Sequence, residues 1–141
     1  AFSFDEIILG AVGNSAIGVK NTSQWAYDLD NAANEQFVKA FRAKYDRTPT
    51  LYASQGYDTA NLILSALEKA RPSDKDAFRK ALKSADFDSV RGSFKFGSNQ
   101  HPIQNIYVRE VVAGDGKKPT NKLVGIAISN LQDAYVSQCT L

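Results

Sequence analysis

Apolar positions recur most regularly between residues 49 and 70, where they predict a helix. They lie three or four residues apart and form a wide stripe made of Tyr57, Ala60, Ile63, Leu64, Ala66, Leu67 and Ala70. A stripe of this width predicts a buried helix that packs on more than one side. Pro49 is expected to stop the preceding helix, because its ring disfavours helical geometry at the residue before it. The helix would follow a short segment carrying Tyr52 and Gln55, two side chains able to hydrogen-bond.

Further helices are predicted on both sides of this one. Residues 28–31, Asp-Leu-Asp-Asn, supply N-cap candidates for a helix over about residues 32–46. Its predicted apolar face comprises Phe37, Ala40, Phe41 and Tyr45. Ser73 is the expected N-cap of the next helix, with Asp76 in the capping-box position. The apolar residues of that helix, expected to face inward, are Phe78, Ala81 and Leu82. Residues 4–13 predict a short helix or turn.

Alternating and β-branched residues predict the strands. Residues 17–26 alternate loosely and fit one strand, and residues 90–96 fit a turn and a short strand. Residues 106–112 and 123–128 are separated by a glycine-rich turn and predict a hairpin with a longer loop. A short terminal helix is expected from residue 133. Three helices lie between so few strands that two interpretations stay open: a small α+β domain, or a larger sheet completed by sequence not shown.

Composition narrows the class of protein. The chain has 141 residues, of which 43% are hydrophobic and 11% aromatic, enough for a packed core. Its net charge of +2 comes from interspersed signs, and the basic residues between 39 and 47 fit the solvated side of a helix. We therefore expect no nucleic-acid site. No apolar run is long enough to cross a membrane, so membrane insertion is not expected. The start, without an initiator Met or a signal peptide, suggests processing or truncation.

Catalytic and metal-binding patterns are not found in the sequence. One His and one Cys stand far apart, with no nucleophile motif around either. Metal-ligand spacings and glycine-rich phosphate loops are also missing, so neither a metal nor a cofactor is expected and the chain is not expected to be an enzyme. Cys139 cannot form a disulfide within the chain. It is either a small apolar residue or half of a disulfide whose partner lies outside this segment.

Three ordered motifs carry a resemblance to a known family. They are Asp-Asn-x-x-Asn-x-x-Phe at residues 30–37, Pro-x-x-Tyr-Ala-x-x-Gly-Tyr-Asp-x-Ala at residues 49–60 and Arg-Gly-x-Phe-x-Phe at residues 91–96. From about residue 10 onward, the chain resembles the later part of periplasmic binding proteins. The subfamily is the leucine/isoleucine/valine-binding type, which serves ATP-binding-cassette (ABC) importers.

The resemblance implies an α/β fold of the type I periplasmic binding protein class, present here in part. Such receptors have two three-layer lobes joined by crossing strands. By this comparison, residues 1–25 and 105–141 belong to the C-terminal lobe, and residues 26–104 belong to the N-terminal lobe. The hinge crossings would fall at Trp25, Ala26 and Tyr27, and again at Gln104 and Asn105.

The same resemblance implies candidate ligand-binding residues, each with a plainer alternative. Tyr52 aligns with an aromatic position that lines the ligand cleft, and its alternative is a core tyrosine. Gln55 would also point toward the ligand cleft, or would instead be a polar, solvent-facing residue at the start of a helix. Trp25 would contact ligand or pack between the lobes. His101 is either a surface loop residue or a ligand contact. The second role is suggested because its Asn-x-His-Pro-Ile-Gln motif resembles that of family members that take up aromatic acids. Arg91 would pair with a ligand carboxylate or stabilise a turn.

These expectations combine into one predicted function. The chain would be part of an extracytoplasmic, periplasmic solute-binding component of an ABC importer. It would bind a small organic acid, with an aromatic acid favoured over a branched-chain amino acid. The expected partners are the ligand, the N-terminal portion of the same protein and an ABC permease. The alternatives are a ligand sensor on the same scaffold and a stand-alone small α+β enzyme.

Overall fold

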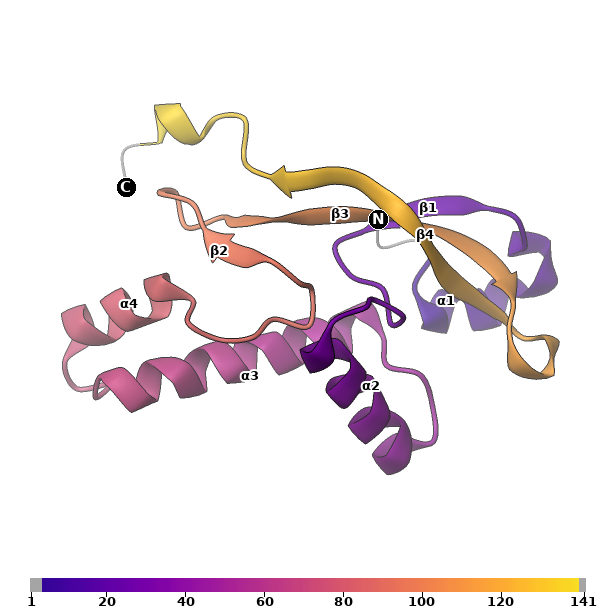
Figure 1. The fold of residues 1–141 in the computed structure, drawn as a ribbon, viewed down its shortest axis with the longest axis horizontal. Helices are drawn as coiled ribbons and strands as arrows, with labels where there is room; N and C mark the ends of the chain where they lie inside the picture. The colour runs from indigo at the N-terminus through magenta and orange to yellow at the C-terminus, as the bar shows by residue number, and fades with distance from the viewer. Residues whose placement is uncertain (1–3, 140–141) are drawn as a thin grey trace.

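The computed structural model describes residues 4–139 and contains a long β-ribbon with helices along it (Figure 1). The helices α2, α3 and α4 lie together on one side of the strands, whereas α1 lies near the far end of the ribbon (Figure 1). In chain order the elements are α1 (Glu6–Val12), the 3-10 turn η1 (Gly13–Ala16), β1 (Lys20–Ser23), α2 (Ala32–Tyr45), α3 (Leu51–Lys69), α4 (Lys75–Ser84), β2 (Phe94–Phe96), β3 (Pro102–Ala113), η2 (Asp115–Lys117), β4 (Pro119–Leu131) and η3 (Val136–Gln138).

The strand β3 organises the sheet. One of its edges pairs antiparallel with β4, which confirms the predicted hairpin. Its other edge pairs with β2 at one end and with β1 at the other, both antiparallel. Gln104 is the last residue of β3 that pairs with β2, and Asn105 follows it before the β1-paired stretch begins at Tyr107. A single strand therefore connects the part of the sheet beside the helices to the part beside α1.

Two predicted elements are shorter in the structure. The strand expected over residues 17–26 is reduced to Lys20–Ser23, because the chain then turns inward and places Trp25 and Ala26 in the core. The expected terminal helix is only the three-residue turn η3.

The caps of α2 and α4 show why these helices begin and end where they do. The Asn31 side chain accepts hydrogen bonds from the backbone N–H groups of Ala33 and Asn34, so one of the predicted N-cap candidates is confirmed. Asp46 ends α2 in the left-handed conformation at φ 50°, before Pro49 is reached. For α4 the predicted cap was wrong by one residue. Asp74, not Ser73, accepts from the N–H of Ala77, and its carboxylate is the stronger acceptor.

The helix α3 departs from its prediction in two ways. It begins at Leu51, capped by Thr50, so Tyr52 and Gln55 lie inside the helix rather than before it. Its apolar stripe is also largely solvent-exposed: Leu64 is 57% exposed and Leu67 is 44% exposed. The residues that α3 buries are Leu51, Ser54, Asp58 and Ala66. The prediction of a helix buried on several sides is thus wrong for this chain, since its neighbours cover only one face.

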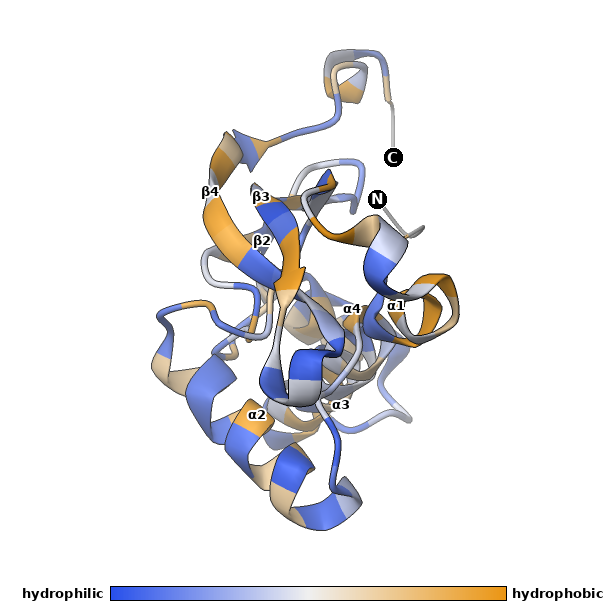
Figure 2. Cartoon of the chain, turned by 90° about the vertical axis from the view of Figure 1, so that its right-hand side faces the viewer, coloured by the Kyte–Doolittle hydropathy of each residue, from blue (hydrophilic) through white to orange (hydrophobic). Residues whose placement is uncertain are grey.

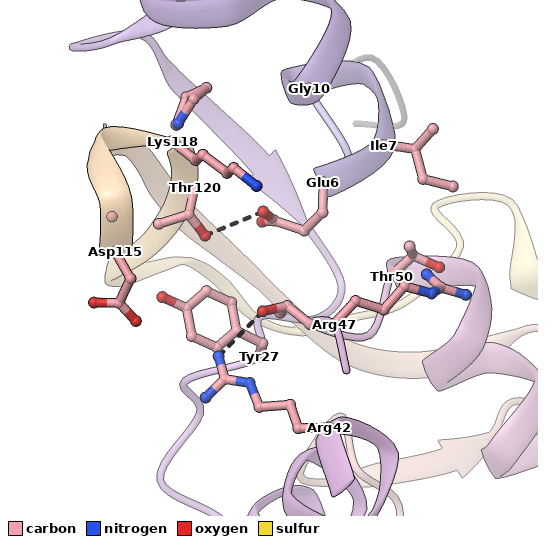
Figure 3. A pocket seen from close by; sticks show the side chains of 13 residues that line it. Glu6, Ile7, Gly10, Tyr27, Arg42, Arg47, Thr50, Asp115, Lys118 and Thr120 are labelled. Atoms are coloured by element: carbon pink, nitrogen blue, oxygen red, sulfur yellow. Dashed lines mark hydrogen bonds between the residues drawn. The ribbon is translucent and has the colours of Figure 1, made fainter. Parts of the chain in front are cut away.

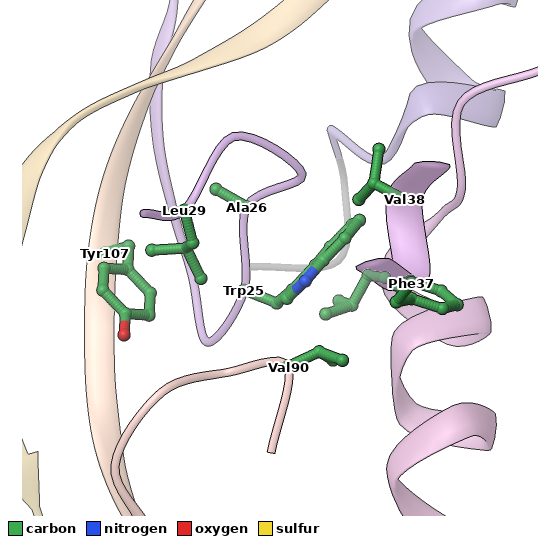
Figure 4. Packing of buried hydrophobic residues seen from close by; sticks show 8 residues of the cluster. Trp25, Ala26, Leu29, Phe37, Val38, Val90 and Tyr107 are labelled. Carbon is green, nitrogen blue, oxygen red and sulfur yellow. The ribbon is translucent and has the colours of Figure 1, made fainter. Parts of the chain in front are cut away.

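The main core forms where the chain leaves β1 and meets α2, α3 and β3 (Figure 4). It contains Trp25, Ala26, Leu29, Phe37, Val38, Leu51, Val90 and Tyr107. A smaller cluster of Leu9, Ala16 and Val111 joins α1 to β3. Other apolar residues remain exposed, including Val124, Ile126 and Ile128 on β4, and Figure 2 shows hydrophobic stretches along that strand.

Candidate functional site

The segment that follows β1 is held against α2 by one buried amide. The Nδ2 of Asn34 donates to the carbonyl oxygens of Tyr27 at 3.0 Å and Leu29 at 3.3 Å. Its Oδ1 accepts from the indole Nε1 of Trp25 at 2.8 Å. Trp25 also packs edge-on against Phe37, with ring centroids 6.3 Å apart. The first motif therefore fixes the backbone at the first predicted crossing, because an amide offers both donor and acceptor groups.

The second and third motifs meet in a buried ion pair. Asp58, which is 1% exposed, accepts from Arg91 Nε at 2.9 Å. The same carboxylate accepts from the hydroxyl of Ser89 at 2.6 Å and from the backbone N–H of Val90 at 3.0 Å. Sequence reasoning missed this pair, which corresponds to neither role considered for Arg91. The only sign of this ion pair in the sequence was that a Tyr-Asp motif is followed by an Arg-Gly motif further along the chain. Neither motif indicates locally that the two are in contact.

Arg91 also connects the helices to β3. Its Nη1 donates to Gln104 Oε1 at 3.0 Å, and its backbone oxygen accepts from the Tyr107 hydroxyl at 2.7 Å. Gly92 has φ +87°, and a Cβ at this position would lie 3.0 Å from the Tyr107 oxygen. Glycine is therefore required next to Arg91 by conformation and by space. The predicted crossing at Gln104 is thus tied directly to α3 through Arg91 and Asp58.

A polar cavity of about 680 Å³ lies between α1, the end of α2 and the β3–β4 turn (Figure 3). Its charged lining residues are Glu6, Arg42, Arg47, Asp115 and Lys118. The Glu6 carboxylate is already satisfied: Thr120 donates to one oxygen, and the backbone and side chain of Asn121 donate to the other. The lining therefore carries three cations against two carboxylates, a small excess of positive charge.

Tyr27 and Arg42 form the floor of this cavity. The Arg42 guanidinium lies over the Tyr27 ring, 5.3 Å from its centroid, and donates to the Thr48 hydroxyl at 3.2 Å. Burial raises the pKa of the Tyr27 hydroxyl above its ordinary value, and a hydrogen bond with Thr120 opposes this rise. Tyr27 consequently presents a neutral hydroxyl at neutral pH.

A second buried cation lies behind the cavity on β3. Arg109 is 3% exposed, and its Nε and Nη2 donate to Asn21 Oδ1 at 3.0 and 2.6 Å. Burial lowers the pKa of Arg109, and the negative charges of Glu6 and Asp5 oppose that shift. Asn21 in turn donates to Asn121 at 2.8 Å. The Asn21 and Asn121 amides thus link Arg109 to Glu6. Among the described residues, no buried side-chain polar atom is without a hydrogen-bond partner.

The structure brings together two of the four predicted ligand residues. Tyr52 and Gln55 are separated by three positions and share one face of α3, with Tyr52 56% exposed. Trp25 is buried in the core, a position that favours its packing alternative. His101 is exposed in the turn between β2 and β3, 3.8 Å from Asp133. None of the four lines the polar cavity, but Tyr27 does, and Thr50 on its wall caps α3.

Other kinds of site lack support in residues 4–139. Within this part of the chain no group of three or more His, Cys, Asp or Glu side chains could hold a metal ion. None of its helices combines the length and hydrophobicity needed to span a bilayer. Cys139 is exposed and unpaired, so both interpretations of this residue stay open.

Comparison with known proteins identifies the class that this fold and site define. The pattern of the periplasmic binding protein family matches residues 1–117, and the chain belongs to that family. A relative from Brucella abortus (strain 2308), described as Leu/Ile/Val-binding protein homolog 6, is 34% identical over 119 residues. The match covers 81% of this chain and 30% of the relative.

The similar solved structures are solute-binding proteins of ABC transporters. An R. palustris solute-binding protein in complex with benzoate superposes with a TM-score of 0.80 at 32% identity, over 95% of this chain and 36% of that protein. One from Rhodopseudomonas palustris BisB5 in complex with 3,4-dihydroxybenzoic acid gives a TM-score of 0.72 at 25% identity, over 92% of this chain and 36% of that protein. The chain thus spans about a third of the length of the relatives it matches, and its fold is part of the type I periplasmic binding protein fold.

Proposed function

We propose that this chain is part of the extracytoplasmic solute-binding component of an ABC importer, and that it helps to bind a small aromatic acid between two lobes in the periplasm. The observation that carries the proposal is the match, across 95% of the chain, to a solute-binding protein in complex with benzoate. The matched relatives are binding proteins, which supports a role without catalysis.

The geometry supports an acidic solute. The polar cavity presents Arg42, Arg47 and Lys118 against two carboxylates, Glu6 and Asp115, and Glu6 is held by its own hydrogen bonds. A concave surface lined by cations raises the local concentration of anions. Tyr52, which is 56% exposed, lies at the start of α3, two residues beyond Thr50 on the cavity wall. We propose Tyr52 and Gln55 as ligand contacts, and the ligand roles of Trp25 and His101 stay predictions.

The proposed mechanism is closure of two lobes. Residues 26–104 would form part of one lobe, and residues 1–25 and 105–141 part of the other. A ligand that contacts both lobes favours the closed form by its greater affinity for that form. Residues 25–27 and 104–105 would absorb the rotation, and the closed receptor would then dock on a membrane permease. The buried contacts of Trp25 and the Arg91–Gln104 bond support well-defined crossings.

A ligand screen on the full-length protein tests this function. Benzoate and 3,4-dihydroxybenzoate are compared with leucine, and benzamide serves as a matched control that keeps the ring but lacks the charge. A ligand that binds only the native state stabilises it by about 2.7 kcal/mol at a hundredfold excess over its Kd. We expect benzoate-like acids to raise the melting temperature and benzamide to leave it unchanged. If leucine alone raises the melting temperature, the proposed ligand class is wrong and an amino acid takes its place. If isothermal titration detects binding of none of these ligands, the proposed function is refuted.

A further inference from the structure

The buried carboxylate of Asp5 joins the starts of two helices that are far apart in sequence. Its Oδ1 accepts from the backbone N–H of Ile7 at 3.3 Å and so caps α1. Its Oδ2 accepts from the backbone N–H of Leu51 at 2.8 Å, at the first residue of α3. Asp5 is only 3% exposed; its bond to Leu51 lies away from solvent, whereas its bond to Ile7 is partly buried.

The chemistry of this bridge is favourable on each side. The first N–H groups of a helix have no partner within the helix, and the N-terminus carries partial positive charge. A carboxylate is therefore a better acceptor here than a neutral group. The Thr50 hydroxyl caps α3 through Ala53, so the Leu51 N–H is left for Asp5. Arg109 on β3 also attracts the negative charge of Asp5.

The bridge also connects parts that the proposed mechanism assigns to different lobes. Asp5 and α1 fall in residues 1–25, whereas Leu51 falls in residues 26–104. The bond lies one residue from Tyr52, the proposed ligand contact. It is not part of either crossing, so lobe rotation would break it while the chain connections stay intact.

We propose that Asp5 is a positioning residue that holds the two lobes in the closed arrangement and thereby sets the affinity for ligand. The proposal rests on the proposed two-lobe function. In the open form, the Leu51 N–H would be hydrated and Asp5 would cap α1 alone. Losing the bridge would reduce the closed population, and the apparent Kd rises in inverse proportion to the binding-competent fraction that remains.

An isosteric substitution prevents residue 5 from capping α1 and bridging to α3 at the same time. Asp5→Asn retains one acceptor oxygen and remains a good N-cap, but its amide NH₂ cannot accept the second N–H. Asp74→Asn is the matched control, because Asp74 caps α4 and accepts only from that helix. In the full-length protein we expect Asp5→Asn to weaken ligand binding about 10-fold or more, as for loss of a hydrogen bond to a charged group. Asp74→Asn should change the Kd less than about twofold.

A second pair of variants removes the donor instead of the acceptor. Leu51→Ala and Leu51→Pro both lose the same buried side chain, but only proline loses the N–H. Proline is well tolerated at the first position of a helix. The residue before a proline favours an extended backbone, and Thr50 already has one. We expect the proline variant to bind ligand more weakly than the alanine variant. This comparison retains its value if Asp5 variants fold poorly.

A ligand-independent measurement distinguishes failure of this proposal from failure of the proposed function. Spin labels at Lys80→Cys on α4 and Lys122→Cys on β4, in a Cys139→Ser background, report the distance between the proposed lobes. Asp5→Asn is expected to shift the ligand-free distribution toward longer distances, whether or not an aromatic acid is the ligand. An unchanged distribution together with a Kd within twofold of the parent would overturn the role of Asp5. A parent that binds no aromatic acid while the distance shift persists would instead overturn the ligand proposal.

Discussion

Removal of the Asp58 carboxylate should be among the most damaging single changes in this chain. Asp58 accepts from Ser89, Val90 and Arg91, and Asp58→Ala leaves all three donors without this partner in a buried setting. Arg91 is the costliest of them, because only 11% of its side chain is exposed. Breaking one side of a buried ion pair typically costs about 3–5 kcal/mol. Since native proteins are stable by only about 5–15 kcal/mol, that loss would approach global unfolding.

Two contacts of Arg91 limit the damage. Its Nη1 keeps the hydrogen bond to Gln104, and its guanidinium stays 4.6 Å from the centroid of the Phe94 ring. A cation–π contact of this kind retains about 0.5–2 kcal/mol. Replacing both partners, as in Asp58→Ala with Arg91→Met, removes the uncompensated charge. The double variant should therefore be less destabilised than the sum of the two single variants, by about 0.5–3 kcal/mol.

Urea denaturation of the full-length protein measures these differences. The midpoint should fall with an unchanged m-value if stability alone has changed. Asp86→Ala is the matched control, because Asp86 pairs with Lys69 on an exposed surface. Its removal should leave the midpoint almost unchanged. If Asp58→Ala shifts the midpoint no more than Asp86→Ala, the buried pair does not link the two motifs energetically and the reasoning fails.

Three further outcomes are expected. Tyr52→Ala in the full-length protein should weaken ligand binding by about 1–3 kcal/mol through loss of an aromatic contact, and an unchanged Kd by titration calorimetry would remove it from the site. Gly92→Ala should destabilise by about 1–3 kcal/mol, because alanine is strained at a positive φ and its methyl group would crowd Tyr107; an unaltered melting temperature would contradict this. The isolated 141-residue chain should bind a hydrophobic dye and self-associate through the exposed faces of α3 and β4, whereas a monodisperse, cooperatively melting monomer would argue against it.

Local signals predicted the elements because they act over a few residues. The helix over residues 32–46 and the hairpin followed from spacing and turn residues, and both are present. Boundaries were less accurate where two neighbours compete for one role, as Ser73 and Asp74 do at the start of α4. Here the stronger acceptor, the Asp74 carboxylate, takes the backbone N–H of Ala77.

The site was harder to predict because its parts come from distant positions. Asp58 and Arg91 were visible only as separate motifs, and their ion pair depends on how α3 packs beside the segment before β2. Nothing in the local pattern marks Asp5 for burial, yet folding buries it between the starts of two helices. The cavity likewise combines α1, the end of α2 and the β3–β4 turn, which are brought together only by the tertiary fold.

The sequence by itself determined where the main helices and the hairpin form, and its ordered motifs indicated the family. Periodicity could show that α3 has an apolar stripe, but it could not show that much of this stripe would remain exposed. The exposure of this stripe depends on which other elements pack against α3, and that is decided only when the chain folds. Only the tertiary structure decided which polar side chains would be buried together, because burial of charge is tolerated only where distant partners supply compensating hydrogen bonds.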